Sequence, residues 1–136
     1  MGRSAQKGSE VGIEIVSTDK APAAIGPYSQ AVKANGFVFT SGVIPVDPVT
    51  AKVVDGGITE QATQVFENLQ AVLAASGSSL SQAVKTTCFL TDLNDFATFN
   101  GIYATYFESD PPARSTVQVA KLPLGVLVEV ECVALL

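Results

Sequence analysis

The first third of the chain alternates apolar and polar residues in short runs that turn-forming residues interrupt. Residues 12–18, GIEIVST, have the period-two pattern of a β-strand, and residues 21–30, APAAIGPYSQ, break that pattern with prolines and a glycine. Residues 29–42 then hold two apolar runs on either side of Asn35-Gly36, a pair that accepts positive φ at both turn positions. The pattern predicts a strand followed by a β-hairpin.

At residue 58 the apolar period changes to that of an amphipathic helix. Apolar residues recur there at three- and four-residue steps: Ile58, Ala62, Val65, Leu69, Val72 and Leu73. Thr59 is the predicted N-cap, and Gly77 lies just past the predicted end. Residues 43–57, which precede this helix, are expected to be a loop with a turn at Asp47-Pro48 and a short strand at 52–54.

The second half of the chain continues with a strand, a helix and two strands. Residues 82–92 have a strand pattern, and residues 94–107 begin with Asn and Asp as a cap and place four aromatic residues on one helical face: Phe96, Phe99, Tyr103 and Phe107. Pro111 and Pro112 end this helix. Two strands follow, at 114–120 and 125–136, joined by a turn at KLPLG.

This order predicts an α+β fold with an antiparallel-dominated sheet and two helices on one face of it. One face of the last strand is wholly apolar: Val126, Val128, Val130, Cys132 and Ala134. The other face is half apolar and carries two carboxylates: Leu127, Glu129, Glu131, Val133 and Leu135. A monomer would expose this second face, so we infer that identical subunits cover it.

Composition indicates one domain. The chain has 136 residues with 47% hydrophobic content, which predicts a single domain at 13–136 behind a flexible tail at 1–12. No apolar run approaches the ~20 residues of a membrane span, and no secretory signal is evident. We therefore expect no membrane association and a cytoplasmic location, with the mitochondrion or plastid as the alternative if the N-terminus is a trimmed targeting segment. The net charge of −5 argues against nucleic-acid partners.

The absence of histidine limits the chemistry. It excludes Ser-His-Asp and Cys-His nucleophiles and most zinc or iron sites, so no metal is expected. Cys88 and Cys132 lie in apolar strand patterns without C-x-x-C spacing and are interpreted as small core residues. Any catalysis must use arginine, carboxylates, hydroxyls, backbone groups or water.

Arg114 is the first candidate for such chemistry. It is one of two arginines in the chain and follows Pro-Pro-Ala at the start of a strand. Its planar guanidinium suits bidentate binding of a carboxylate, while a surface ion pair is the plainer interpretation. Glu129 is a charge in an alternating apolar strand, where a carboxylate either pairs with a cation or handles protons, and Glu131 shares its face.

The remaining candidates each have a structural alternative. Tyr28 lies in a Pro/Gly-shaped loop and would either line a pocket or fill the core. Ser41 and Gly42 end a hairpin strand, where a glycine lets a ligand approach the backbone or merely ends the strand. Asn100 on the second helix would be a ligand contact or an exposed amide.

Five blocks in fixed order carry a family resemblance: APAAIGPYSQAV, FTSGVIPVDP, AVKTTCFLTDLNDFATFN, PPARSTVQVAKLP and VEVECVAL. Together they resemble the RidA (YjgF) family of reactive intermediate deaminases across nearly all of residues 14–136. The resemblance implies a chorismate-mutase-like, ferredoxin-like α+β fold and a homotrimer with clefts between subunits. It also implies hydrolysis of enamines and imines released by pyridoxal-phosphate enzymes, to 2-keto acids and ammonia, with no metal or organic cofactor.

The resemblance also implies roles for individual residues. Arg114 would bind the substrate carboxylate, and Glu129 would position water. The residues that would line the pocket are Tyr28, Ser41, Gly42 and Asn100, with Thr116 contributing its backbone or hydroxyl where some members have cysteine. Two other hypotheses remain: a binding protein that senses keto acids without turnover, and an RNA-directed translation inhibitor or chaperone, which the acidic charge disfavours.

Overall fold

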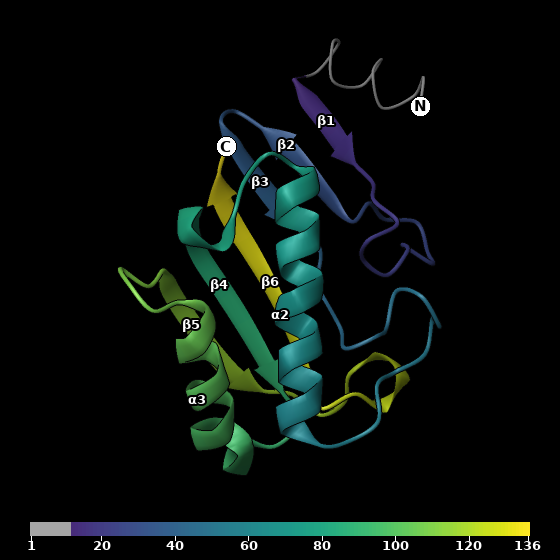
Figure 1. Ribbon diagram of the computed structural model, residues 1–136, viewed down its shortest axis with the longest axis vertical. Coiled ribbons are helices and arrows are strands. Elements are labelled where there is room, and N and C mark those ends of the chain that lie inside the picture. The colour runs from purple at the N-terminus through teal and green to yellow at the C-terminus, as the bar shows by residue number, and fades with distance from the viewer. Residues whose placement is uncertain (1–11) are drawn as a thin grey trace.

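The computed structural model describes residues 12–136, in which two helices lie side by side over one face of a six-stranded mixed sheet (Figure 1). The strands are β1 (Ile13–Val16), β2 (Ala31–Ala34), β3 (Phe37–Thr40), β4 (Ala83–Leu90), β5 (Ala113–Gln118) and β6 (Val128–Leu135). The helices are α2 (Ile58–Ala75) and α3 (Phe96–Tyr106). The predicted α+β plan is confirmed, while the flexible tail predicted at 1–12 lies, apart from residue 12, outside the described residues.

The strand order is β1-β2-β3-β6-β4-β5. Neighbours are antiparallel except β4 and β5, which are parallel because α3 carries the chain back between them. The strands predicted at 114–120 and 125–136 are therefore not neighbours, since β6 lies between β3 and β4. The short strand predicted at 52–54 is reduced to one bridge between Val46 and Val53.

The hairpin prediction is confirmed. β2 pairs with β3, and the two turn residues Asn35 and Gly36 have φ of 54° and 85°. Positive φ at both central positions is the geometry of the type I′ turn, whose twist matches that of the flanking strands.

Helix α2 begins where the periodicity predicted, but its N-cap is Gly57 and not Thr59. The N–H of Gly57 donates to Oε1 of Glu60 at 2.8 Å, so the side chain three residues into the helix serves the backbone donor of the cap residue itself. Thr59 lies inside the first turn. Gly77, just past the helix, has φ of 84°, the left-handed conformation that glycine adopts most easily at this position.

The core lies between the helices and the sheet. The inner face of β6, and Val126 two residues before the strand, are 1% exposed or less, as predicted: Val126, Val128, Val130, Cys132 and Ala134. Phe66 of α2 is fully buried, and its ring lies 5.6 Å from that of Tyr103 and 6.0 Å from that of Phe99, which join α3 to the same core. Within residues 12–136, neither helix has the length and apolar character that crossing a membrane requires.

The other face of the sheet, here called the open face, has no helix over it (Figure 1). Three large apolar side chains on it stay exposed: Phe39 at 41%, Val117 at 42% and Leu135 at 46%. Cross-strand register places Phe39 beside Val133 in the middle of this face. Apolar side chains gathered on one sheet face are typical of a surface that another protein surface covers.

Candidate active site

Arg114 lies on the helix-covered face at the edge strand β5. Its register partner in β4 is Thr86, which is fully buried beneath the helices. Nη1 of Arg114 donates to Oδ1 of Asn100 at 2.7 Å, and the guanidinium carbon lies 4.6 Å from the ring centroid of Tyr103 and 5.4 Å from that of Phe96. No carboxylate pairs with Arg114 within residues 12–136, so the surface ion-pair interpretation is wrong there.

Thr116 projects from β5 on the same face as Arg114, two residues further along. Its Oγ1 is buried and makes no hydrogen bond of ordinary geometry among the described residues, although it interacts with the thiol of its register partner Cys88. A thiol is a weak partner, so this poorly satisfied hydroxyl, beside a guanidinium without a carboxylate partner, is suited to contact a ligand. Its register partner Cys88 is not reactive, because burial raises the pKa of that thiol to about 11 although Arg114 acts to lower it.

Cys132, the other cysteine, is also a core residue. It is 1% exposed and not in a disulfide. Burial, and then the nearby Cys88, raise its pKa to about 12. Both thiols therefore stay protonated near neutral pH, and the sequence interpretation of them as core residues is confirmed.

Glu129 lies on the open face, in β6. Its register partner is Phe89 of β4, whose side chain is on the face opposite to Thr86. Burial raises the pKa of Glu129, and the charge of the neighbouring Glu131 raises it further. A carboxyl group with a raised pKa is a better proton acceptor near neutral pH than an ordinary glutamate.

Tyr28, Ser41 and Gly42 line a cavity of about 190 Å³ beside the end of β3. Most of its other walls are apolar, including Ile25, Val43, Ile44, Val72 and Leu124. Tyr28 is 51% exposed, so it is a wall and not core filling. Oγ of Ser41 donates to the carbonyl oxygen of Ser29 at 2.5 Å, which ties the Tyr28 loop to β3 and leaves this hydroxyl only its acceptor lone pairs.

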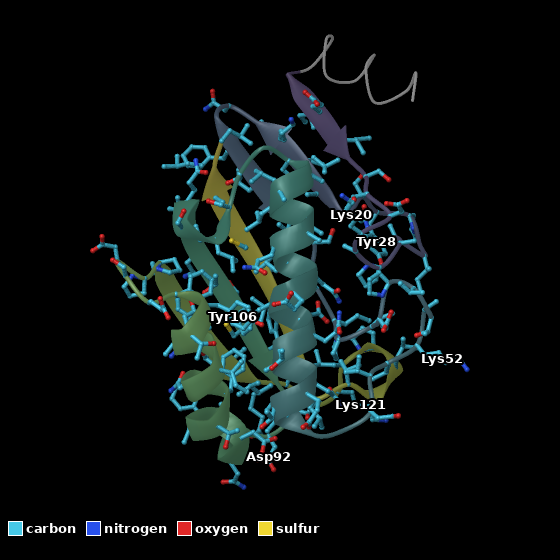
Figure 2. The ribbon with its side chains drawn as sticks, viewed as in Figure 1. Lys20, Tyr28, Lys52, Asp92, Tyr106 and Lys121 are labelled. Atoms are coloured by element: carbon cyan, nitrogen blue, oxygen red, sulfur yellow. The ribbon has the colours of Figure 1, made fainter. Side chains whose placement is uncertain are left out.

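The structure divides the predicted residues into two sets that a single chain keeps apart. Arg114, Asn100 and Thr116 form what we call the arginine half, on the helix-covered face at β5. Glu129 with the adjacent Gly42, and Ser41 and Tyr28 of the cavity that Gly42 also lines, are called the glutamate half, at β6 and the end of β3. The sheet separates Arg114 from Glu129, and Figure 2 shows Tyr28 among the loops on one side of α2 and Tyr106 of α3 on the other. Within one chain, the two halves therefore do not form a single site.

Comparison with known proteins shows which family the chain belongs to. Residues 18–136 match the family model described as Endoribonuclease L-PSP. The chain belongs to this family. It is 55% identical over 128 residues, 94% of this chain and 68% of the relative, to Reactive Intermediate Deaminase A, chloroplastic, of Arabidopsis thaliana. It is 49% identical over 121 residues, 89% and 90% of the two chains, to the 2-iminobutanoate/2-iminopropanoate deaminase of Mus musculus.

A solved structure shares the fold. The crystal structure of yeast Mmf1 superposes with a TM-score of 0.88 at 50% identity, over 90% of this chain and 98% of that one. The RidA resemblance drawn from the five sequence blocks is thereby confirmed at the level of the family.

Sequence reasoning missed the support of the guanidinium. Phe96 and Tyr103 were predicted on one face of the second helix without any link to Arg114, and the structure shows that both rings contact its guanidinium. The signal that would have indicated this contact is an arginine in the same domain as a helix with aromatic residues along one face, because a guanidinium is attracted to the face of an aromatic ring.

Proposed function

We propose that the chain is an enzyme that hydrolyses reactive enamine and imine intermediates, namely 2-aminoacrylate, 2-iminopropanoate and 2-iminobutanoate, to 2-keto acids and ammonia. Removal of these intermediates would protect pyridoxal-phosphate enzymes from damage. The printed names of the Arabidopsis and mouse relatives support the reaction. The observation that carries the proposal is the arginine half, where a guanidinium without a carboxylate partner among the described residues and a poorly satisfied buried hydroxyl share one face of β5.

The reaction needs few groups. Arg114 binds the substrate carboxylate, with Asn100 fixing one of its nitrogens and Thr116 adding a hydroxyl. Glu129 accepts a proton from water as the water oxygen bonds to the imine carbon. Glu129 returns this proton to the nitrogen, the new hydroxyl group loses its own proton to Glu129 as the carbonyl forms, and the carbon–nitrogen bond breaks with its electron pair leaving on ammonia, which gives the 2-keto acid. The iminium carbon is already electrophilic, so this scheme requires holding the substrate, water and a proton acceptor, and no metal or organic cofactor.

The catalytic site would form between subunits of a homotrimer with a chorismate-mutase-like fold. The separation of Arg114 from Glu129 by the sheet supports a site shared between chains. The two halves are different surfaces, so the contact between them would be head-to-tail, which closes into a ring when the rotation from one subunit to the next allows it. The ring size of three comes from the family resemblance, and residues 13–136 would be the single domain of each subunit.

The deciding assay generates 2-aminoacrylate with a serine dehydratase and follows pyruvate. The protein should accelerate pyruvate appearance beyond the spontaneous rate, and Arg114→Ala should accelerate it far less at the same concentration. An equal rate with and without the wild-type protein would contradict the proposed activity.

The proposed location of the protein is the cytoplasm, with the plastid or mitochondrion as the alternative. The name of the Arabidopsis relative describes that protein as chloroplastic.

A keto-acid sensor is the second candidate, because the arginine half is built without any contribution from Glu129. Glu129→Gln separates the two functions. An enzyme should lose turnover in this variant, whereas a sensor has no turnover to lose and keeps its affinity for 2-oxobutanoate.

A further inference from the structure

The guanidinium of Arg114 rests on an aromatic side chain that is itself fixed. Tyr103 of α3 is 7% exposed, and its ring lies 4.6 Å from the guanidinium carbon, closer than the ring of Phe96 at 5.4 Å. A cation over the face of an aromatic ring is attracted by the ring's negative face. Tyr103 therefore contacts the charge that is proposed to bind substrate, while lying too deep to contact the substrate itself.

The hydroxyl group of Tyr103 is held by a hydrogen bond to the sheet. Its Oη shares a hydrogen bond of 2.7 Å with Oγ1 of Thr86, and both groups are buried. Thr86 is also the register partner of Arg114 across β4 and β5. Burial raises the pKa of Tyr103, so the phenol stays protonated and keeps this hydrogen bond throughout the neutral range.

The packing around the ring fixes its plane. The ring of Tyr103 lies 4.5 Å from that of Phe107, 5.6 Å from that of Phe66 and 5.9 Å from that of Phe99. With Thr86 at the hydroxyl and these rings at the sides, the upper face of Tyr103 is a rigid support. The Asn100 bond then fixes one edge of the guanidinium and leaves its remaining N–H groups free of described carboxylates.

We propose that Tyr103, held by Thr86, is a positioning residue that orients the Arg114 guanidinium for bidentate binding of the substrate carboxylate. This inference rests on the proposed function. A flexible arginine side chain loses conformational entropy whenever substrate binds, whereas a side chain that is already ordered does not. The contact with Tyr103 should therefore increase the affinity for substrate. Its loss should raise KM and leave kcat nearly unchanged, because the carboxylate is held alike in the ground and transition states.

Three variants test the support. Tyr103→Leu removes the ring and should raise KM about 3- to 30-fold, the range that a cation–π contact represents. Tyr103→Phe keeps the ring but removes its hydrogen bond to Thr86. It should raise KM less than Tyr103→Leu does, because the ring still supports the guanidinium and retains most of the substrate affinity. Thr86→Val breaks the same hydrogen bond from the other side and should match Tyr103→Phe. A Tyr103→Phe enzyme with the wild-type KM would overturn the role of the hydroxyl.

Tyr106 provides the matched control. It is the next tyrosine of α3, its ring stacks on Phe66 at 5.0 Å, and its Oη donates to Oε2 of Glu67 at 2.8 Å. None of its contacts involves Arg114 (Figure 2 places it between α2 and α3). Tyr106→Phe and Tyr106→Leu should therefore change stability without changing KM.

A double-mutant cycle separates positioning from general packing. Tyr103→Leu should lower kcat/KM in the wild-type background and have no further effect in an Arg114→Ala background, because the group that it orients is gone. If Tyr103→Leu lowers kcat/KM by the same factor in both backgrounds, Tyr103 acts only through packing and the inference is wrong. If Arg114→Ala alone leaves kcat/KM unchanged, the proposed site is wrong, and that result is distinct from failure of the cycle. Should Tyr103→Leu fail to fold, the same cycle with Tyr103→Phe gives the decision.

Discussion

The carboxylate of Glu129 occupies the space beside Gly42 that a β-carbon would need. A Cβ built on Gly42 would lie 2.7 Å from Cδ and 3.0 Å from Cγ of Glu129, closer than non-bonded carbons approach. The clash involves the flexible end of a side chain and not the backbone, so an added methyl group would move the carboxylate and not the strands. The position of the proposed proton acceptor thus depends on a glycine.

Gly42→Ala should consequently lower turnover by at least about 10-fold, which is modest for the loss of a positioned general base. Stability should change little, because Glu129 can swing aside. Deaminase assays and thermal unfolding measure the two effects. Gly101→Ala is the control, since Gly101 lies on α3 with nothing within 4 Å of a built Cβ and a helical alanine there should be neutral or stabilising. Full turnover in Gly42→Ala would argue against a role for the Glu129 carboxylate.

Arg114→Ala should lower kcat/KM by about 10- to 100-fold, the loss expected for one or two charge-assisted hydrogen bonds. Arg114→Lys should recover little of this. Lysine keeps the charge but has neither the planar fork for a carboxylate nor the flat surface that lies over Tyr103. Steady-state kinetics and calorimetric titration with 2-oxobutanoate provide the measurement, and wild-type affinity in Arg114→Lys would show that charge alone is sufficient.

Glu131→Gln should lower the pKa of Glu129. Burial is the first cause of the raised pKa of Glu129 and the Glu131 charge is the second, so the variant removes only the second. The acidic limb of the pH–rate profile should move to lower pH. In a Glu129→Gln background the same change should have no effect on that limb.

The same pKa shift has a consequence for stability. A raised folded-state pKa means that the stability contributed by protonated Glu129 is present at low pH and is lost as pH rises through that pKa. Glu131→Gln should therefore gain stability over the wild type at neutral pH, but not well below the ordinary value of 4.5. Urea denaturation at the two pH values tests this, and a gain that is equal at both would contradict it.

Phe39→Asp should dissociate the assembly. Phe39 is 41% exposed on the open face beside Val133, so an aspartate there costs a single chain little but would be an unpaired charge in a covered interface. Light scattering of the wild type should give about three times 14.1 kDa, and the variant should approach one chain and lose activity. Val49→Asp, at a loop residue that is 91% exposed, is the control. A wild-type protein that is monomeric at micromolar concentration would contradict the shared site.

Local signals in the sequence predicted the local structure well. The Asn35-Gly36 turn, the start of α2 and the buried face of β6 each depend on residues close together in the chain. The cap at Gly57 was missed because a glycine has no side chain to indicate capping, and the bond that satisfies its N–H comes from Glu60.

The pairing of β-strands that are distant in the sequence could not be predicted in the same way. β6 inserts between β3 and β4, and its Cys132 N–H donates to Oγ1 of Thr40, 92 residues earlier. No pattern within either segment encodes that partner. The faces of Arg114 and Glu129 follow from this pairing, so the sequence identified both residues and could not show that the sheet separates them.

Subunit complementation tests the central claim, that one site takes Arg114 from one chain and Glu129 from another. Arg114→Ala and Glu129→Gln should each be strongly impaired alone, at least about 10-fold below the wild type, with unchanged assembly mass. When the two variants are unfolded together and refolded as a mixture, about a quarter of the sites in a head-to-tail ring should combine two intact halves, and activity should return to that fraction of the wild-type rate. A mixture that contains mixed assemblies by mass spectrometry and remains as inactive as its components would contradict a site shared between chains.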